Sequence, residues 1–191
     1  MRMTPQQLLS GYVQGIFPMA EEDGTLYWYD PDPRTILPLD ENFHMSRRLA
    51  RTVRQGKFEI RIDYNFRAVM QNCAARPKTW ISSEMIELYS ALHRAGFAHS
   101  VETWRDGQLV GGLYGVAING LFAGESMFSY ERDASKVALV HLVQRLRKRR
   151  YLLLDVQFST DHLKHFGAMS IPRLEYHQRL VQALMRKTWF A

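Results

Sequence analysis

Cysteine is nearly absent from the sequence, and long apolar runs are missing altogether. The one cysteine among 191 residues, Cys73, cannot form an internal disulfide, which excludes a small secreted domain held together by disulfides. We therefore expect a reducing, cytoplasmic location. No run of about 18 apolar residues is present, so no membrane-spanning helix is expected. The N-terminal residues lack a long apolar core and a small-residue cleavage site, which argues against a signal peptide.

The sequence also lacks a glycine-rich phosphate-binding loop and a metal-ligand motif. Residues 129–135, which join an expected strand to an expected helix, read SYERDAS and contain no glycine. Coenzyme A acetyltransferases hold the pyrophosphate with a glycine-rich turn at such a junction, so this segment counts against a coenzyme. His162 and His165 have no acidic or cysteine ligand in motif spacing, so we expect no metal. Cys73 lies on an apolar helix face and is interpreted as a core residue.

The composition is that of a globular protein with surplus positive charge. Hydrophobic residues make up 46% and charged residues 23%, which excludes a disordered or fibrous chain. The length predicts one domain or two small ones packed together. The formal net charge of +6 allows a polyanionic partner without requiring one.

Hydrophobic periodicity and capping residues predict the elements of the N-terminal part. Thr4 is suited to cap a first helix, and a short basic helix is expected between residues 46 and 56. Prolines at positions 18, 31, 33 and 38 predict that no regular element forms over residues 18–40. Residues 58–62 alternate like a strand, and Asp63 is a candidate cap for the helix that follows.

The C-terminal part is more clearly patterned. A helix near residues 82–96 is followed by three strands with hairpin turns at Asp106-Gly107 and Asn119-Gly120, dipeptides that favour positive φ at both positions. A helix over 133–150, a buried strand over 151–158, a short helix and a last helix over 173–186 complete the order. We therefore predict an α+β fold like the Gcn5-related acyltransferases, with a small N-terminal subdomain (1–62) and an acyltransferase-like catalytic domain (63–191).

The strand YLLLDVQF carries a carboxylate among apolar residues. Strand alternation places Asp155 and Gln157 on one face. A buried carboxylate must be paired, solvated or hydrogen-bonded, so Asp155 is one of two things. It is a structural residue satisfied by backbone amides, or it points with Gln157 into a cleft from one rigid element.

Glu125 and Trp80 each have a structural and a functional interpretation. Glu125 lies between Gly124 and Ser126, which marks either a strand bulge with an ion pair or a place where a ligand approaches the backbone. Trp80 lies in a loop between two helices, as a core anchor or as a platform on which a nucleobase stacks.

Basic residues gather at two places in the sequence. Arg47, Arg51 and Arg54 share one helical face, which favours a binding surface for a polyanion. The run from Arg145 to Arg150 ends the helix over 133–150, and cations there are stabilised by the helix dipole without any ligand. We interpret this second run as a solvated face.

Several motifs together resemble one family, the bacterial leucyl/phenylalanyl-tRNA–protein transferases. The similar segments are GIFPM (15–19), WYDPDPR (28–34), TWI (79–81), GFAHSVE (96–102), LVGGLYGVA (109–117), LFAGESMFS (121–129), DASKVAL (133–139) and DVQF (155–158). The resemblance runs from about residue 4 to residue 178. Met19 departs from the family, in which a Trp is common at that place.

The resemblance implies an activity and its partners. Such enzymes transfer Leu or Phe from Leu-tRNA or Phe-tRNA to proteins whose N-terminal residue is Arg or Lys. The transfer marks those proteins for degradation by the N-end rule. The resemblance implies no metal and no cofactor. The alternatives are a coenzyme-A-dependent small-molecule acetyltransferase of the same fold and a non-catalytic RNA-binding module.

The resemblance also implies roles for particular residues. Asp155 and Gln157 match the catalytic pair, and Trp80 matches the residue that stacks on the terminal adenine. The pocket for the transferred side chain matches Leu113, Phe122, Met127, Leu139 and Leu154. Glu125, with Gly124 and Ser126 beside it, and Tyr89 match further groups of the cleft. Arg47, Arg51 and Arg54 are the expected tRNA contacts.

Overall fold

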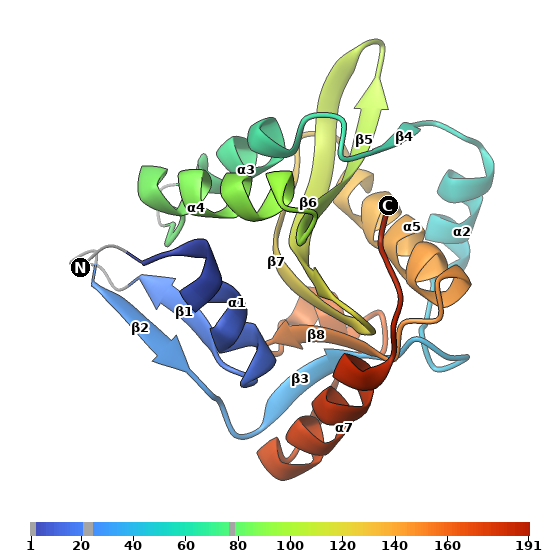
Figure 1. The fold of residues 1–191 in the computed structure, drawn as a ribbon. Helices are drawn as coiled ribbons and strands as arrows, with labels where there is room; N and C mark the ends of the chain where they lie inside the picture. Colours follow the sequence, from blue (N-terminus) through green and yellow to red (C-terminus); the bar gives the residue numbers. More distant parts are fainter. Residues whose placement is uncertain (1–2, 21–24, 77–78) are drawn as a thin grey trace.

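The computed structural model describes residues 3–20, 25–76 and 79–191 as a mixed α+β fold (Figure 1). Within these residues a seven-stranded sheet has the order β4-β5-β6-β7-β8-β3-β9, and a separate pair is formed by β1 and β2. The strands of the large sheet, in that order, are Glu59–Ile62, Ala98–Arg105, Gln108–Ile118, Leu121–Ser129, Leu153–Gln157, Arg34–Leu37 and Met169–Ile171.

The sheet is antiparallel except between β7 and β8, which pair in parallel. A parallel pair needs a long crossover, and α5 (Ala134–Lys148) provides it. Both hairpins form where expected. Asp106 and Gly107 have φ of +49° and +75°, as predicted. Asn119 has φ +52°, but Gly120 does not have a positive φ. A Cβ on Gly120 would lie 2.8 Å from the Ala183 carbonyl oxygen, so this glycine lets the last helix approach.

The expected helices form, with one capping residue corrected. They are α1 (Pro5–Val13), α2 (Arg47–Arg54), α3 (Phe66–Ala74), α4 (Ser83–Arg94), α6 (Asp161–Lys164) and α7 (Arg173–Met185). Thr4 caps α1 in a capping box with Gln7. The prediction that Asp63 caps α3 was wrong, because Asn65 does so. The Asp63 carboxylate instead accepts from the Ser100 amide and lies 2.7 Å from His99 Nδ1.

The prediction of no regular element over residues 18–40 was also wrong. Strand β1 (Phe17–Ala20) pairs with β2 (Leu26–Tyr29), and β3 is inserted between β8 and β9 of the large sheet. Proline is tolerated in such strands at an edge or just outside the ends. Pro18 lies in the two-stranded pair, and Pro33 and Pro38 flank β3 on either side.

The two faces of the large sheet carry separate hydrophobic clusters. On one face α5 packs against β5 and β6, and the cluster there includes Leu139, Leu142 and Leu154. Helices α1, α3 and α4 lie on the other face (Figure 1). They contribute a second cluster that includes Cys73. Cys73 is buried, as predicted, and burial raises its pKa to about 12. Strands β3 and β4, both from residues 1–62, are part of this sheet.

None of the described helices is long and apolar enough to cross a bilayer.

Candidate active site

A pocket of about 300 Å³ opens where β6, β7 and β8 meet α5 and the segment after β8. Its apolar wall is made by the side chains of Leu113, Met127, Leu139, Leu142 and Leu154. Phe17 and Met19 of β1 and the half-buried ring of Trp80 contribute from the N-terminal side. Such a wall suits an apolar side chain, because a polar one would lose its water without replacement.

Glu125 and Gln157 provide the polar side of the pocket. Gln157 Nε2 donates to Glu125 Oε1 at 3.1 Å. The Tyr89 hydroxyl donates to Glu125 Oε2 at 3.1 Å, and the Tyr12 hydroxyl lies 2.5 Å from that of Tyr89. Both tyrosines are buried. Glu125 is therefore held between a side-chain amide from β8 and two hydroxyls from α1 and α4.

The surroundings raise the pKa of Glu125 to about 7. Burial is the main cause, and the negative charge of Asp155 adds to it. Hydrogen bonds from Tyr12 and Tyr89 and the charge of Arg34 act in the opposite direction. A carboxyl group with this pKa populates both protonation states near neutral pH, which suits it to accept and return a proton.

Asp155 lies behind the pocket and is not part of its wall. Its side chain is fully buried and forms a bidentate ion pair with Arg34 of β3. Arg34 Nε donates to Oδ1 at 2.9 Å and Arg34 Nη2 donates to Oδ2 at 2.6 Å. The Tyr176 hydroxyl donates to Oδ2 at 3.0 Å and the Gln157 amide to Oδ1 at 2.9 Å. With four donors, this carboxylate has little capacity left for a substrate.

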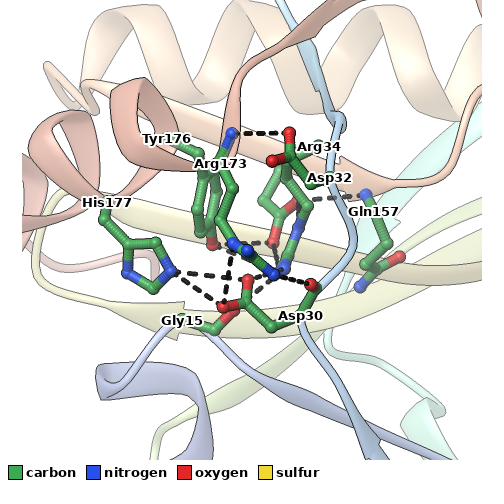
Figure 2. A network of polar contacts seen from close by, with 9 residues as sticks. Gly15, Asp30, Asp32, Arg34, Gln157, Arg173, Tyr176 and His177 are labelled. Atoms are coloured by element: carbon green, nitrogen blue, oxygen red, sulfur yellow. Dashed lines mark hydrogen bonds and ion pairs between the residues drawn. The ribbon is translucent and has the colours of Figure 1, made fainter.

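Arg34 is enclosed as completely as its partner. Nη1 donates to the Gly15 carbonyl oxygen at 2.9 Å (Figure 2). The guanidinium carbon lies 4.6 Å from the ring centroid of Phe17 and 4.3 Å from that of Tyr176. Sequence reasoning missed Arg34 because its segment was interpreted as irregular. The available signal was the arginine that ends the motif WYDPDPR, together with the need of a buried aspartate for a partner.

Asp30 extends this network toward the surface. It lies 3.8 Å from Arg34 Nη1 and 3.2 Å from His177 Nε2. Arg173 Nη1 donates to the Asp30 carbonyl oxygen at 3.1 Å (Figure 2). The segment between β2 and β3 is therefore fastened to α7, which helps to hold β3 and Arg34 against β8.

The side chains of Asp155 and Gln157 do not point to the same place, although strict strand alternation predicts that they share one face. Gln157 has φ +60°, and the register between β3 and β8 shifts between Thr35 and Ile36. Such an irregularity redirects a side chain. Gln157 lines the pocket, whereas Asp155 binds its backbone amide from behind.

Most of the predicted site residues line the pocket. They are Trp80, Leu113, Gly124, Glu125, Ser126, Met127, Leu139, Leu154 and Gln157. Tyr89 lies one layer behind, on Glu125. Phe122, the other residue expected in the pocket, is fully buried beneath the wall, where its ring packs on Phe190 at 5.2 Å between centroids. Phe17, Leu142 and His162 line the pocket without having been predicted.

The predicted tRNA contacts lie outside the pocket. Arg47, Arg51 and Arg54 form part of α2 and are exposed. In the part of the chain that the structure describes, none of the three has a carboxylate within ion-pair distance, whereas neighbouring Arg48 pairs with Asp133 at 3.5 Å. Their charge is thus available to a partner.

One histidine in the pocket and one cluster with two histidines are the candidates for metal binding. His162 lines the pocket, and its buried Nε2 atom has no hydrogen-bond partner among the residues that the structure describes. Asp63, His93 and His99 place their ligand atoms within 4.8 Å of one another. Those atoms are engaged within the protein, since His93 Nδ1 lies 2.8 Å from the Ala98 carbonyl oxygen and His99 Nδ1 pairs with Asp63.

Two family models match nearly the whole chain. The model of the leucyl/phenylalanyl-tRNA protein transferase matches residues 36–181, and the model of the N-terminal domain of the same enzyme matches residues 1–32. The chain belongs to this family.

Curated relatives agree with the match. A leucyl/phenylalanyl-tRNA–protein transferase of Herpetosiphon aurantiacus is 62% identical over 99% of this chain and 98% of its own length. The enzyme of Gloeobacter violaceus is 55% identical over 95% of this chain and 94% of its own length. The enzyme of Rubrobacter xylanophilus is 52% identical over the full length of both chains.

Proposed function

We propose that this chain is an aminoacyltransferase that transfers Leu or Phe from aminoacyl-tRNA to the N-terminal residue of acceptor proteins. The observation that carries the proposal is an apolar pocket closed on one side by the Glu125–Gln157 pair. A mainly apolar wall rejects polar amino acids by desolvation and admits both Leu and Phe. Membership of the family supports the same activity.

The reaction needs positioning of the two substrates and the movement of one proton from the amine to the leaving oxygen. The aminoacyl ester is already activated, and an N-terminal amine with a pKa of about 8 is partly neutral at pH 7. The amine nitrogen forms a bond to the ester carbonyl carbon, the bond from that carbon to the ribose oxygen breaks, and the ribose hydroxyl leaves with a proton. Ionised Glu125 accepts the proton from the amine and returns it to the ribose oxygen.

Gln157 and Asp155 divide the roles that the resemblance implies for them. The Gln157 amide reaches the same space as Glu125 and orients the attacking amine. Asp155 acts through Gln157, because it binds the Gln157 backbone amide and is itself held by Arg34 and Tyr176. We therefore assign Asp155 as a positioning residue and Gln157 as a catalytic one.

The proposed activity also defines the partners of the enzyme. Trp80 stacks on the terminal adenine, and Arg47, Arg51 and Arg54 neutralise phosphates of the tRNA. The acceptor begins with Arg or Lys. The reaction uses no cofactor and no metal, and it takes place in the cytoplasm.

The chain has a Gcn5-related acyltransferase fold and two parts in this proposal. The order of the meander β5–β7, the crossover helix α5 and the parallel strand β8 supports the proposal of a fold like that of the Gcn5-related acyltransferases. A small N-terminal subdomain over residues 1–62 and a catalytic domain over 63–191 stay predictions.

The decisive experiment is transfer of labelled Leu or Phe from charged tRNA to a protein that begins with Arg. We expect incorporation with this acceptor and with its Lys counterpart. The matched controls are the same protein beginning with Ser, and the Arg acceptor with an acetylated N-terminus. Incorporation that is absent with all acceptors, together with direct binding of acetyl-coenzyme A, would favour the acetyltransferase instead.

A further inference from the structure

A second basic surface lies where the C-terminal end of α5 meets the segment that follows α7. It surrounds a shallow hollow of about 580 Å³. We call it the C-terminal basic surface and define it by the cations that line the hollow and the tryptophan beside them: Lys148, Arg149, Arg150, Arg186, Lys187 and Trp189. None of these residues belongs to the pocket of the candidate active site.

The cations of this surface are not neutralised within the described part of the chain. No carboxylate there lies within ion-pair distance of any of the five. The basic residues at the C-terminal end of α5 fall into two sets, those that bond to the protein and those that do not. Arg145 Nε donates to the Phe190 carbonyl oxygen at 2.7 Å, and Arg147 Nε donates to the Leu39 carbonyl oxygen at 2.8 Å. These two hold the fold together, whereas the side chains of Lys148, Arg149 and Arg150 donate to no carbonyl oxygen of the described residues.

Trp189 is presented to solvent on an anchored backbone. Its side chain is 67% exposed, and the Arg149 guanidinium carbon lies 5.4 Å from its ring centroid. The residues on both sides are fixed: the Thr188 hydroxyl donates to the Arg149 carbonyl oxygen at 2.7 Å, and Phe190 is buried. A tryptophan that the core does not use, next to an arginine, has the chemistry of a stacking platform for a base.

Arg150 occupies a backbone position that favours glycine. It follows the C-cap of α5 with φ +59°, where a Cβ is disfavoured. Helix dipoles account for cations at the C-terminal ends of α5 and α7. They do not account for an exposed tryptophan at the same place, nor for a residue other than glycine at a position with φ +59°.

We propose that the C-terminal basic surface binds the phosphate backbone of the tRNA outside its aminoacylated end, with Trp189 stacking on an accessible base. The identification of the RNA as tRNA rests on the proposed function. Arg48 of α2 pairs with Asp133 at the start of α5, and the C-terminal basic surface lies at the other end of this helix. A helix of 15 residues is about 22 Å long, less than one turn of a nucleic-acid duplex at about 34 Å. One RNA molecule can therefore reach both ends.

The test measures the affinity for charged tRNA as a function of salt concentration. The variant Lys148→Gln/Arg150→Gln/Lys187→Gln removes three charges without reversing any. Each lost phosphate contact lowers the salt slope by about 0.9, so we expect a slope smaller by roughly 2 to 3 and an affinity at least about fivefold weaker. Transfer from a short aminoacyl-adenosine donor should stay at the wild-type rate, because that donor does not reach this surface.

The matched control is Arg67→Gln/Arg105→Gln/Arg179→Gln, which removes the same charge from exposed arginines that are paired with Glu87, Glu131 and Glu175. It should keep the wild-type salt slope. In a separate variant, Trp189→Ala should weaken tRNA binding severalfold and Trp189→Phe should restore part of the loss. Circular dichroism verifies that each variant is folded.

An unchanged salt slope and affinity in the folded triple variant would overturn the proposal. A loss equal to that of the control would do the same, since it would reflect net charge alone. Competition by poly-glutamate at the same charge concentration as tRNA would show an acidic-protein surface instead. Failure of the proposed function gives a different result, because wild-type protein would then transfer neither Leu nor Phe from either donor. The difference in salt slope between the variants would still show whether the C-terminal basic surface binds tRNA.

Discussion

Arg34 and Asp155 form a buried bidentate ion pair between β3 and β8, across 121 residues of sequence. The pair lies directly behind Gln157, whose backbone amide donates to the same carboxylate. The position of Gln157 in the pocket wall therefore depends on two charged side chains that do not themselves line the pocket.

Asp155→Asn should destabilise the protein and slow the reaction. Loss of one partner leaves Arg34 as an unpaired buried charge, at a cost of about 3–5 kcal/mol in the free energy of unfolding. We expect the double variant Arg34→Gln/Asp155→Asn to recover part of that stability, because two neutral amides can bond each other. Turnover should remain about 10²-fold below wild type in both variants, since without the ion pair the strand end that carries Gln157 is no longer held in place.

Denaturant titration gives the stabilities, and single-turnover transfer gives the rates. Near-normal turnover in folded Asp155→Asn would show that the carboxylate has no part in orienting Gln157, and catalysis would then rest on substrate positioning alone.

The rate of transfer should rise with pH through about 7 because Glu125 must be ionised to accept a proton. Its pKa of about 7 places this rise below the one expected from the acceptor amine. Glu125→Gln should lower the rate by about 10²-fold or more and remove the step near pH 7. The measurement is a pH profile of single-turnover transfer for both proteins. A step that persists in Glu125→Gln would assign it to another group.

The same carboxyl should make the stability depend on pH. Its pKa in the folded protein is raised from 4.5, so between about pH 4.5 and 7 the folded state holds a proton that the unfolded state has lost. The free energy of unfolding therefore falls as pH rises through this window, by the contribution of this group. In Glu125→Gln that contribution should disappear, which denaturant titrations at pH 5 and pH 8 can verify.

Met127→Ala should change the choice of transferred amino acid. Met127 is half-buried in the pocket wall, so its truncation adds space for the larger Phe side chain. We expect the ratio of kcat/KM for Phe to that for Leu to rise about tenfold or more, since even one methylene in an apolar pocket is worth about 1–3 kcal/mol.

Phe122→Ala is the matched contrast, because Phe122 lies beneath the wall. It should cost about 3–5 kcal/mol of stability and reduce both transfers by a similar factor. If Phe122→Ala alters the ratio of the two amino acids more than Met127→Ala does, the pocket extends into the core during the reaction.

Trp80→Ala should weaken the use of a short aminoacyl-adenosine donor as well as of intact tRNA. Stacking of a base on an aromatic ring is worth about 1–3 kcal/mol, so the apparent affinity should fall at least severalfold for both donors. Trp80→Phe should restore part of the effect. Unchanged affinity for the short donor in folded Trp80→Ala would make this residue a core anchor.

Reversal of Arg47, Arg51 and Arg54 to Glu should act on intact tRNA only. These exposed cations have no carboxylate partner among the described residues, so their loss removes phosphate contacts and reduces the salt slope. The short donor should be used at the wild-type rate. A wild-type salt slope in this variant would show that this face of α2 meets only solvent.

The sequence by itself determined local structure wherever a few neighbouring residues determine the conformation. Thr4 and Gln7 close a capping box within one turn of α1, and Asp106-Gly107 turns the first hairpin with its own φ angles. Glu125 stood out because a carboxylate between small residues is unusual in a buried strand. The family motifs are likewise contiguous stretches, so the function could be proposed before any contact was known.

Only the tertiary structure decided which distant groups meet. The proline-containing segment joins the sheet through β3 because Arg34 provides the charge that buried Asp155 requires, and a pairing over 121 residues leaves no periodic trace in the sequence. Strict alternation could not separate Gln157 from Asp155, because the register shift opposite them depends on β3. Phe122 lies beneath the pocket for the same kind of reason: Phe190, far along the chain, packs on its ring and holds it in the core.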